Sequence, residues 1–261
     1  MAAAAQVPAF RATFLPDTAS TRQYIGAWAV LSVVQYLVAE AAVIGAWAGP
    51  APYSRRTGLI SDLGAVTCGI YDGRSICSPL HVLMNTSFVV QGLGMLLGAL
   101  LLSSALLRVA ARAGVRVAAS HTGEVPWYTA VAVRILTGTA GTGTIIVGLV
   151  PEDLESAWHY AGAVMYFIAG SLALLLLGTL WLRQSPLGWF VLAAGGVSTA
   201  ALVTAAVAGL DVPEPGTLER LMAYPITMGL SAAGLVVAQR VRKERQVRKA
   251  FAARARAASG G

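Results

Sequence analysis

The residues best suited to chemistry are concentrated between positions 58 and 88, where two aspartates, two cysteines, a histidine and an asparagine lie between long apolar runs. His81 and Asn85 are four residues apart, so a helix would place both side chains on one face. Glu155 and His159 repeat this spacing later in the chain. Because histidine exchanges protons near neutral pH and also ligates metals, this set indicates acid–base or ligand-binding chemistry.

Four of these residues form the predicted reactive set. His81 and His159 are expected to exchange protons or bind a ligand, and Asp62 and Glu152 to orient them. Asn85 and Glu155 are expected to contact the ligand. The sequence leaves open whether the chain is an enzyme at all.

Two alternatives for this set stay open. Two histidines and a carboxylate have the donor count of a catalytic zinc site, but the spacing does not demand one, so no metal or cofactor is assigned. Histidines at helix starts also commonly cap the helix or bond a neighbouring loop. A serine nucleophile (Ser61, Ser78 or Ser87) beside His81 is less favoured, because no nucleophile-elbow pattern surrounds any of these serines.

Glu40 and Arg134 are opposite charges inside apolar runs, where ionisable groups are costly and usually face the interior of a helix bundle. At a rise of 1.5 Å per residue, Glu40 lies about 24 Å and Arg134 about 12 Å from the same face of the membrane. A direct pair between them therefore requires that the helix ends are shifted relative to one another. Both are candidates for ligand contact or for a proton relay. The alternatives are a hydrogen-bonded structural carboxyl for Glu40 and an arginine that extends toward the interface for Arg134.

The elements that must position these residues are membrane-spanning helices. The chain is 56% hydrophobic and only 12% charged, with a mean hydropathy of +0.67, which favours an integral membrane protein. Six runs approach the ~20 apolar residues that cross a hydrocarbon core, at 24–48, 80–106, 126–150, 157–181, 187–209 and 218–239. We therefore expect an all-α, six-helix transmembrane domain over 24–239, an N-terminal tail over 1–23 and a basic tail over 240–261.

Charges alternate between the two sides of this bundle. One side carries basic residues in the N-tail, two loops and the C-terminal tail, namely Arg11, Arg22, Arg108, Arg112, Arg116, Arg183 and eight from Arg240 onward. The other carries most of the acids and only Arg55, Arg56, Arg74 and Arg220. The positive-inside rule then predicts a multi-pass plasma-membrane protein with both termini in the cytoplasm. The net charge of +7 therefore indicates topology, with membrane lipids and no nucleic acid as partners.

Cys68 and Cys77, the only cysteines, share the first loop on the outer side. An oxidising compartment there favours a disulfide between them, and two unrelated reduced thiols are the alternative.

Several short motifs carry a family resemblance. Ile60-Ser-Asp-Leu-Gly64, Pro79, Asn85-Thr-Ser-Phe88, and Gly148-Leu-Val-Pro-Glu152 followed by His159 resemble the six-span family known as domain of unknown function 998, over residues 24 to 239. The first motif is more distantly similar to the DRAM/Sfk-type six-span proteins, some of which act in lipid organisation or remodelling. The resemblance implies the fold and supplies no reaction.

Three functional classes remain. The leading hypothesis is an outward-facing polar pocket that binds or processes a lipid or a small amphiphile. A proton-coupled transporter would use Glu40 and Arg134 within the membrane. A noncatalytic scaffold would use small-residue faces, such as the run over 137–144, to form an oligomer or to bind another membrane protein.

Overall fold

The computed structural model describes residues 19–111, 127–154 and 156–259. Within these ranges six helices are long and apolar enough to span a membrane, which confirms the all-α six-span prediction. The first span joins α1 (Thr21–Leu31), the 3-10 turn η1 (Ser32–Val34) and α2 (Gln35–Gly45). The others are α3 (His81–Leu101), α5 (Trp127–Leu149), α6 (Ala157–Trp181), α7 (Leu187–Ala208) and α8 (Pro215–Ser259).

Two spans differ from their expected bounds. The second ends at Leu101 rather than 106, because the Ser103 hydroxyl accepts the Leu106 N–H at 3.2 Å and starts a separate short helix, α4 (Ser104–Leu107). The last begins at Pro215 rather than 218 and continues unbroken through the basic tail to Ser259. Alanine and arginine favour helix over this tail. Glu219 and Arg220 therefore lie inside the helix, whereas the charge pattern counted both with the loop charges although the expected span contained them.

The six spans pack around a closed ring, in the order α1, α3, α5, α6, α7, α8 and back to α1. Close approach in this ring depends on glycines of the small-residue run in α5. A β-carbon at Gly141 would lie 2.7 Å from the carbonyl oxygen of Gly92 in α3, and one at Gly162 in α6 would lie 2.7 Å from the carbonyl oxygen of Gly143. The run therefore brings three helices together backbone to backbone, as small residues do in membranes.

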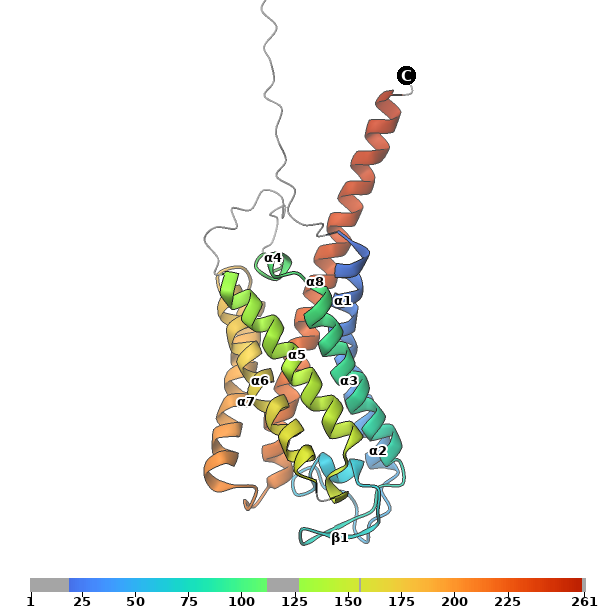
Figure 1. The fold of residues 1–261 in the computed structure, drawn as a ribbon, viewed down its shortest axis with the longest axis vertical. Helices are drawn as coiled ribbons and strands as arrows, with labels where there is room; N and C mark the ends of the chain where they lie inside the picture. Colours follow the sequence, from blue (N-terminus) through green and yellow to red (C-terminus); the bar gives the residue numbers. More distant parts are fainter. Residues whose placement is uncertain (1–18, 112–126, 155, 260–261) are drawn as a thin grey trace, which may run out of the picture.

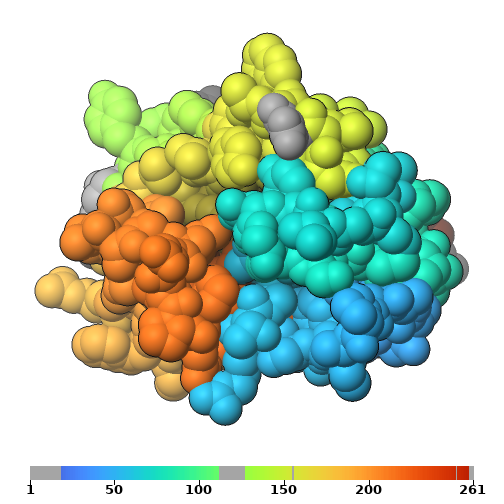
Figure 2. All heavy atoms as spheres, turned by 90° about the horizontal axis from the view of Figure 1, so that it is seen from below, coloured from blue at the N-terminus to red at the C-terminus, as the bar shows by residue number. Residues whose placement is uncertain are grey.

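The connections at the two ends of the bundle differ (Figure 1). One end, called here the hairpin end, carries residues 46–80, 150–154 and 209–214. The opposite end, the tail end, carries α4 and the extension of α8 beyond the bundle. Figure 2 looks onto the hairpin end and shows the first loop (cyan) beside the second (yellow) and the third (orange).

The first loop folds into a 3-10 turn, η2 (Ser61–Gly64), and a small hairpin of β1 (Gly69–Tyr71) and β2 (Arg74–Ile76). The strands are antiparallel, with Gly69 opposite Ile76. Asp72 and Gly73 form the turn and both have positive φ, 47° and 73°. Asp-Gly is the sequence that a two-residue turn of this kind prefers. Cys68 and Cys77 are disulfide-bonded at the open end of the hairpin.

Candidate functional site

The η2 turn is the centre of the polar residues at the hairpin end. Asp62 is 2% exposed, and its Oδ2 accepts the N–H of Leu59 at 2.7 Å. A carboxylate oxygen of Glu219 accepts the N–H of Ile60. On the other side, the Asn85 amide donates to the Gly64 carbonyl at 2.8 Å. Carboxylates from two elements thus satisfy the free N–H groups that begin a helical turn.

The hairpin brings Arg74 onto this turn. Its Nε lies 3.0 Å from Oδ1 of Asp62, its Nη1 3.1 Å from Asp72, and its Nη2 3.5 Å from Oε1 of Glu152. Burial opposes ionisation of Arg74, but Asp62 and Glu152 outweigh it and raise its pKa. One cation therefore faces two buried carboxyls and one exposed one.

Glu152, which is 5% exposed, stays protonated in this arrangement. Burial raises its pKa to about 9, and the hydrogen bond and negative charge of Asp62 act in the same direction. A carboxyl that hydrogen-bonds a carboxylate must carry the proton, and Arg74 lies nearer to Asp62 than to Glu152. Asp62 is thus the charged partner and Glu152 the neutral one.

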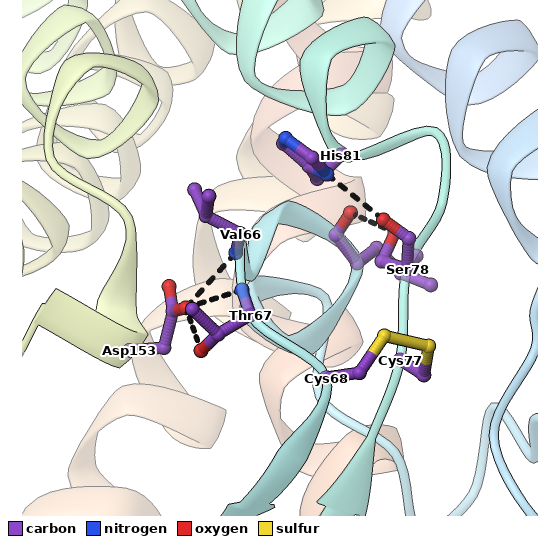
Figure 3. The surroundings of a disulfide bond; sticks show 8 residues. Val66, Thr67, Cys68, Cys77, Ser78, His81 and Asp153 are labelled. Atoms are coloured by element: carbon purple, nitrogen blue, oxygen red, sulfur yellow. Dashed lines mark hydrogen bonds between the residues drawn. A yellow bond between two sulfur atoms is a disulfide. The ribbon is translucent and has the colours of Figure 1, made fainter.

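Asp153 joins the second loop to the first (Figure 3). Its Oδ2 accepts the N–H of Val66 at 3.0 Å and both the N–H and the hydroxyl of Thr67, at 2.8 and 2.7 Å. Burial opposes ionisation, but these hydrogen bonds outweigh it and lower the pKa of Asp153. This contact fixes Glu152, the preceding residue, against Asp62.

A second charged cluster lies where α2, the first loop and α8 meet. Nη2 of Arg220 is 2.9 Å from Oε1 of Glu40 and 2.6 Å from the hydroxyl of Tyr53, and the Tyr224 hydroxyl donates to Glu40 at 2.7 Å. Nη1 of Arg220 donates to three backbone carbonyls, those of Arg55, Gly58 and Gly216. Both charges are buried and fully bonded, so this pair holds the loop to the bundle.

Two hollows adjoin these clusters. The first, called here the outer cleft, has a volume of about 270 Å³ and is lined by Trp47, Tyr53, Asp62, Arg74 and neighbouring residues of the first loop. The rings of Trp47 and Tyr53 meet edge to face with centroids 5.0 Å apart. The second, called here the inner cavity, lies within the bundle below η2 and has a volume of about 50 Å³.

The structure brings together only part of the predicted site. Asp62 and Glu152 meet through Arg74, and Asn85 supports the same turn. His159 is buried below them, with Nδ1 2.7 Å from the carbonyl oxygen of Val150. The ring of His81 instead points to the Ser78 carbonyl, 3.0 Å away (Figure 3). Within the described part of the chain, it has no hydrogen bond to any other member of the set.

The remaining predicted residues lie elsewhere. Glu40 pairs with Arg220 rather than with Arg134. Arg134 donates to the carbonyl of Ala99 at 2.9 Å and to the hydroxyl of Ser104 at 3.3 Å, next to α4 at the tail end. Glu40 and Arg134 therefore lie at different depths along the bundle, as the count of residues along their helices predicts. Glu155, with Arg11, Arg112 and Arg116 of the charge pattern, lies outside the described residues.

The described geometry gives no support to a metal site or to two of the three candidate serines, Ser78 and Ser87. Among the residues with described positions, no three His, Cys, Asp or Glu side chains are grouped to hold a metal ion. The Ser78 hydroxyl donates to the Leu63 carbonyl at 2.6 Å, and that of Ser87 to the Met84 carbonyl at 2.9 Å. Both hydroxyls are therefore bonded to backbone oxygen rather than to an imidazole base.

Sequence reasoning missed three residues of the site: Arg74, Glu219 and Arg220. All three were counted only as loop charges. Two signals could have found them. Asp72-Gly73 predicts a hairpin that returns Arg74 to the turn, and Pro215 is typical of a first helical residue, which places Glu219 and Arg220 inside α8.

Comparison with known proteins gives one match. The model of a family described as protein of unknown function (DUF998) matches residues 30–236. Neither a curated protein nor a solved structure matches the chain. The more distant resemblance to the DRAM/Sfk-type proteins therefore stays a prediction.

Proposed function

This chain belongs to the DUF998 family of proteins of unknown function, and on that premise we propose that it is a membrane binding protein that holds the anionic head group of a lipid or small amphiphile in the outer cleft. The observation that carries the proposal is the composition of that cleft. It combines Arg74, whose side chain is 24% exposed, with the aromatic pair Trp47 and Tyr53.

The cleft suits a head group in size and in position. Its volume of about 270 Å³ is below that of most drug-sized sites, so it fits a head group rather than a whole lipid. Trp47 follows the end of α2 at Gly45 by two residues, which is where interfacial tryptophans lie in membrane proteins. A lipid could thus keep its tails in the bilayer while its head group enters the cleft.

Arg74 is the group that would recognise the anion. A guanidinium has five N–H donors in a planar fork that matches phosphate. Its Nε is bonded to Asp62, and Nη1 and Nη2 each have one acidic partner, which leaves one N–H on each for a ligand oxygen. Protonation of Glu152 lessens the negative charge that such an anion would meet.

Binding fits the geometry better than catalysis. The hydroxyls of Ser78 and Ser87 donate to backbone carbonyls. His81 bonds the Ser78 carbonyl before α3, and His159 bonds the Val150 carbonyl after α5. Among the described residues, neither imidazole has a hydrogen bond to a hydroxyl, as a serine–histidine pair requires.

We further propose that the hairpin end faces the cell exterior in the plasma membrane. Arg22, Arg183 and the basic extension of α8 belong to the tail end, while Asp62, Glu152 and Glu214 belong to the hairpin end. The positive-inside rule then supports a cytoplasmic tail end. The disulfide at the hairpin also suits an oxidising compartment. Single cysteines at Ser54 and Ser259 test this, because an impermeant maleimide added to whole cells should label Ser54→Cys only. Labelling of Ser259→Cys would reverse the orientation.

The binding proposal is tested with purified protein in nanodiscs of neutral lipid. Short-chain phosphatidylglycerol is titrated against the wild type, and Arg74→Gln is expected to weaken its binding at least tenfold. Arg56→Gln is the matched control, because Arg56 lies in the same loop, is 75% exposed and does not line the cleft. Equal affinities of both variants and the wild type would refute the proposal.

A second arm identifies the source of the anion. Glycerol phosphate carries the same phosphate without acyl chains. Binding of the short-chain lipid alone supports a membrane lipid, and equal binding of both ligands assigns the cleft to a soluble phosphate compound. The variant Trp47→Ala leaves Arg74 and its partners in place and should also weaken lipid binding, which separates loss of the site from loss of the fold.

A further inference from the structure

The inner cavity is a polar space inside an otherwise apolar bundle. Its polar walls come from α2, η2, α3, α5, α6 and α8 and consist of Tyr36, Ser61, Gln91, Thr144, His159, Tyr166 and Glu219. The volume of about 50 Å³ exceeds the ~10–15 Å³ that one water molecule needs on this measure. The cavity therefore has room for a few water molecules and not for a lipid head group.

One wall residue requires a partner that the described chain does not supply. Tyr36 is 2% exposed, and its buried hydroxyl has no hydrogen-bond partner among the described residues. A buried hydroxyl without a partner is costly, and most such groups in folded proteins are bonded to protein or to ordered water. In contrast, the Tyr166 hydroxyl accepts from Gln91 at 3.1 Å and donates to the Ala223 carbonyl at 3.2 Å.

His159 presents a proton acceptor to this space. Its Nδ1 lies 2.7 Å from the Val150 carbonyl oxygen. A carbonyl oxygen can only accept, so Nδ1 carries the hydrogen, and in the neutral ring Nε2 is left with a lone pair. The ring lines the cavity and has Asp153 as its nearby negative charge.

Glu219 is the second titratable wall residue. One of its oxygens accepts the N–H of Ile60. It is faced by Asp62 from η2, Glu152 from the second loop and Tyr36 from α2, with Arg220 beside it on α8. Its buried carboxyl thus has one charged carboxylate, Asp62, and one guanidinium, Arg220, as neighbours, and Arg74 is paired with the same Asp62.

We propose that the inner cavity holds a short chain of ordered water and that Glu219 and His159 exchange a proton through it. In this exchange the Glu219 carboxyl gives its proton to the water chain and becomes a carboxylate, while Nε2 of His159 takes up a proton and the ring becomes an imidazolium. Transfer in the opposite direction restores both neutral groups, so atoms and charge balance in each step.

The site reaches from the carboxyl cluster at the hairpin end toward the middle of the bundle. Gln91 lies ten residues into α3, about 15 Å along its axis, and bonds both Tyr166 and Thr227. An exchangeable proton at this depth is a property of proton-linked membrane proteins. Arg74 and Trp47 do not line the cavity, so the proposal does not require a ligand in the outer cleft.

The variant Tyr36→Phe tests whether the cavity contains water. If the hydroxyl bonds a cavity water, its removal lowers the melting temperature of the protein in detergent. If the cavity is dry, removal of a buried hydroxyl without a partner raises the melting temperature or leaves it unchanged, and the proposal fails. Tyr166→Phe is the matched control and should lower the melting temperature in both cases, because its hydroxyl has partners within the protein.

Infrared difference spectra of the full chain in nanodiscs test the proton exchange. Because Glu152 also carries a proton, the spectra are taken in the Glu152→Gln background. There a protonated carboxyl band that titrates with pH should be lost when Glu219→Gln is added, and its midpoint should move when His159→Asn is added. The asparagine amide keeps a donor for the Val150 carbonyl but cannot titrate. If this variant does not fold, the ¹⁵N shifts of His159 give the same information, since their midpoint should move in Glu219→Gln. Independent titration of the two groups would overturn the exchange, whatever ligand the outer cleft binds.

Discussion

Removal of the Arg220 guanidinium is the most demanding test of the charge network. Arg220 and Glu40 have side chains that are only 7% and 2% exposed, and their charged atoms are 2.9 Å apart. In Arg220→Met, Glu40 keeps only the Tyr224 hydroxyl, at 2.7 Å, while Tyr53 and the carbonyls of Arg55, Gly58 and Gly216 lose their bonds from Arg220. Breaking a buried pair from one side costs about 3–5 kcal/mol. For a chain of this size, that corresponds to a fall in melting temperature of about 6–20 °C.

Tryptophan emission during thermal unfolding of the detergent-solubilised protein measures this loss. The double variant Glu40→Gln with Arg220→Met should recover much of it, because no uncompensated charge is left in the interior. Arg56→Met, which breaks an exposed pair with Glu214, should show no measurable change. The reasoning is refuted if Arg220→Met melts within about 2 °C of the wild type, or if the double variant is no more stable than the single one.

Three further predictions concern the hairpin end and the helix contacts. Replacement of Cys68 and Cys77 together by serine should lower the free energy of unfolding by about 2.5 kcal/mol for a loop of this length, and a reductant should lower the melting temperature of the wild type similarly. Because burial and Asp62 raise the pKa of Glu152 from 4.5 to about 9, the folded chain holds a proton that the unfolded chain releases. The resulting stability is fully present below about pH 4.5 and is lost as the pH rises to about 9. The melting temperature of the wild type should therefore fall between these pH values, and that of Glu152→Gln should fall less steeply. Gly141→Val should abolish folding, since its side chain would meet the α3 backbone; normal gel filtration and melting would contradict that packing.

The sequence was sufficient for the spans, because long apolar runs have a single solution in lipid. The small-residue run over 137–144 also predicted a contact surface correctly, and Gly141 and Gly143 lie at contacts with α3 and α6. Periodicity and composition determine such features locally. The orientation of the chain and the plasma membrane as its location stay predictions.

The side chains that meet at the site were harder to predict, because their contacts depend on short loops. His81 and His159 were paired by their positions at helix starts, but His81 bonds the Ser78 carbonyl just before α3, and His159 bonds the Val150 carbonyl just after α5. Arg220 was counted with the loop charges although the expected span, 218–239, contained it, and α8 begins three residues earlier, at Pro215. A charge near a helix end can face water or the bundle, and hydropathy does not locate helix ends accurately enough to decide between them.

The η2 turn is the point at which the resemblance motifs converge. Asp62 and Glu152 belong to those motifs and meet at Arg74, while Asn85 holds the end of the turn. Consecutive residues of the turn also line different hollows: Ser61 lines the inner cavity, and Asp62 lines the outer cleft. A ligand that draws Arg74 away from Asp62 would therefore act on the same short segment that closes the cavity. Because Asp62 accepts the Leu59 N–H and Glu219 that of Ile60, a displacement of the turn at one hollow must change hydrogen bonds at the other.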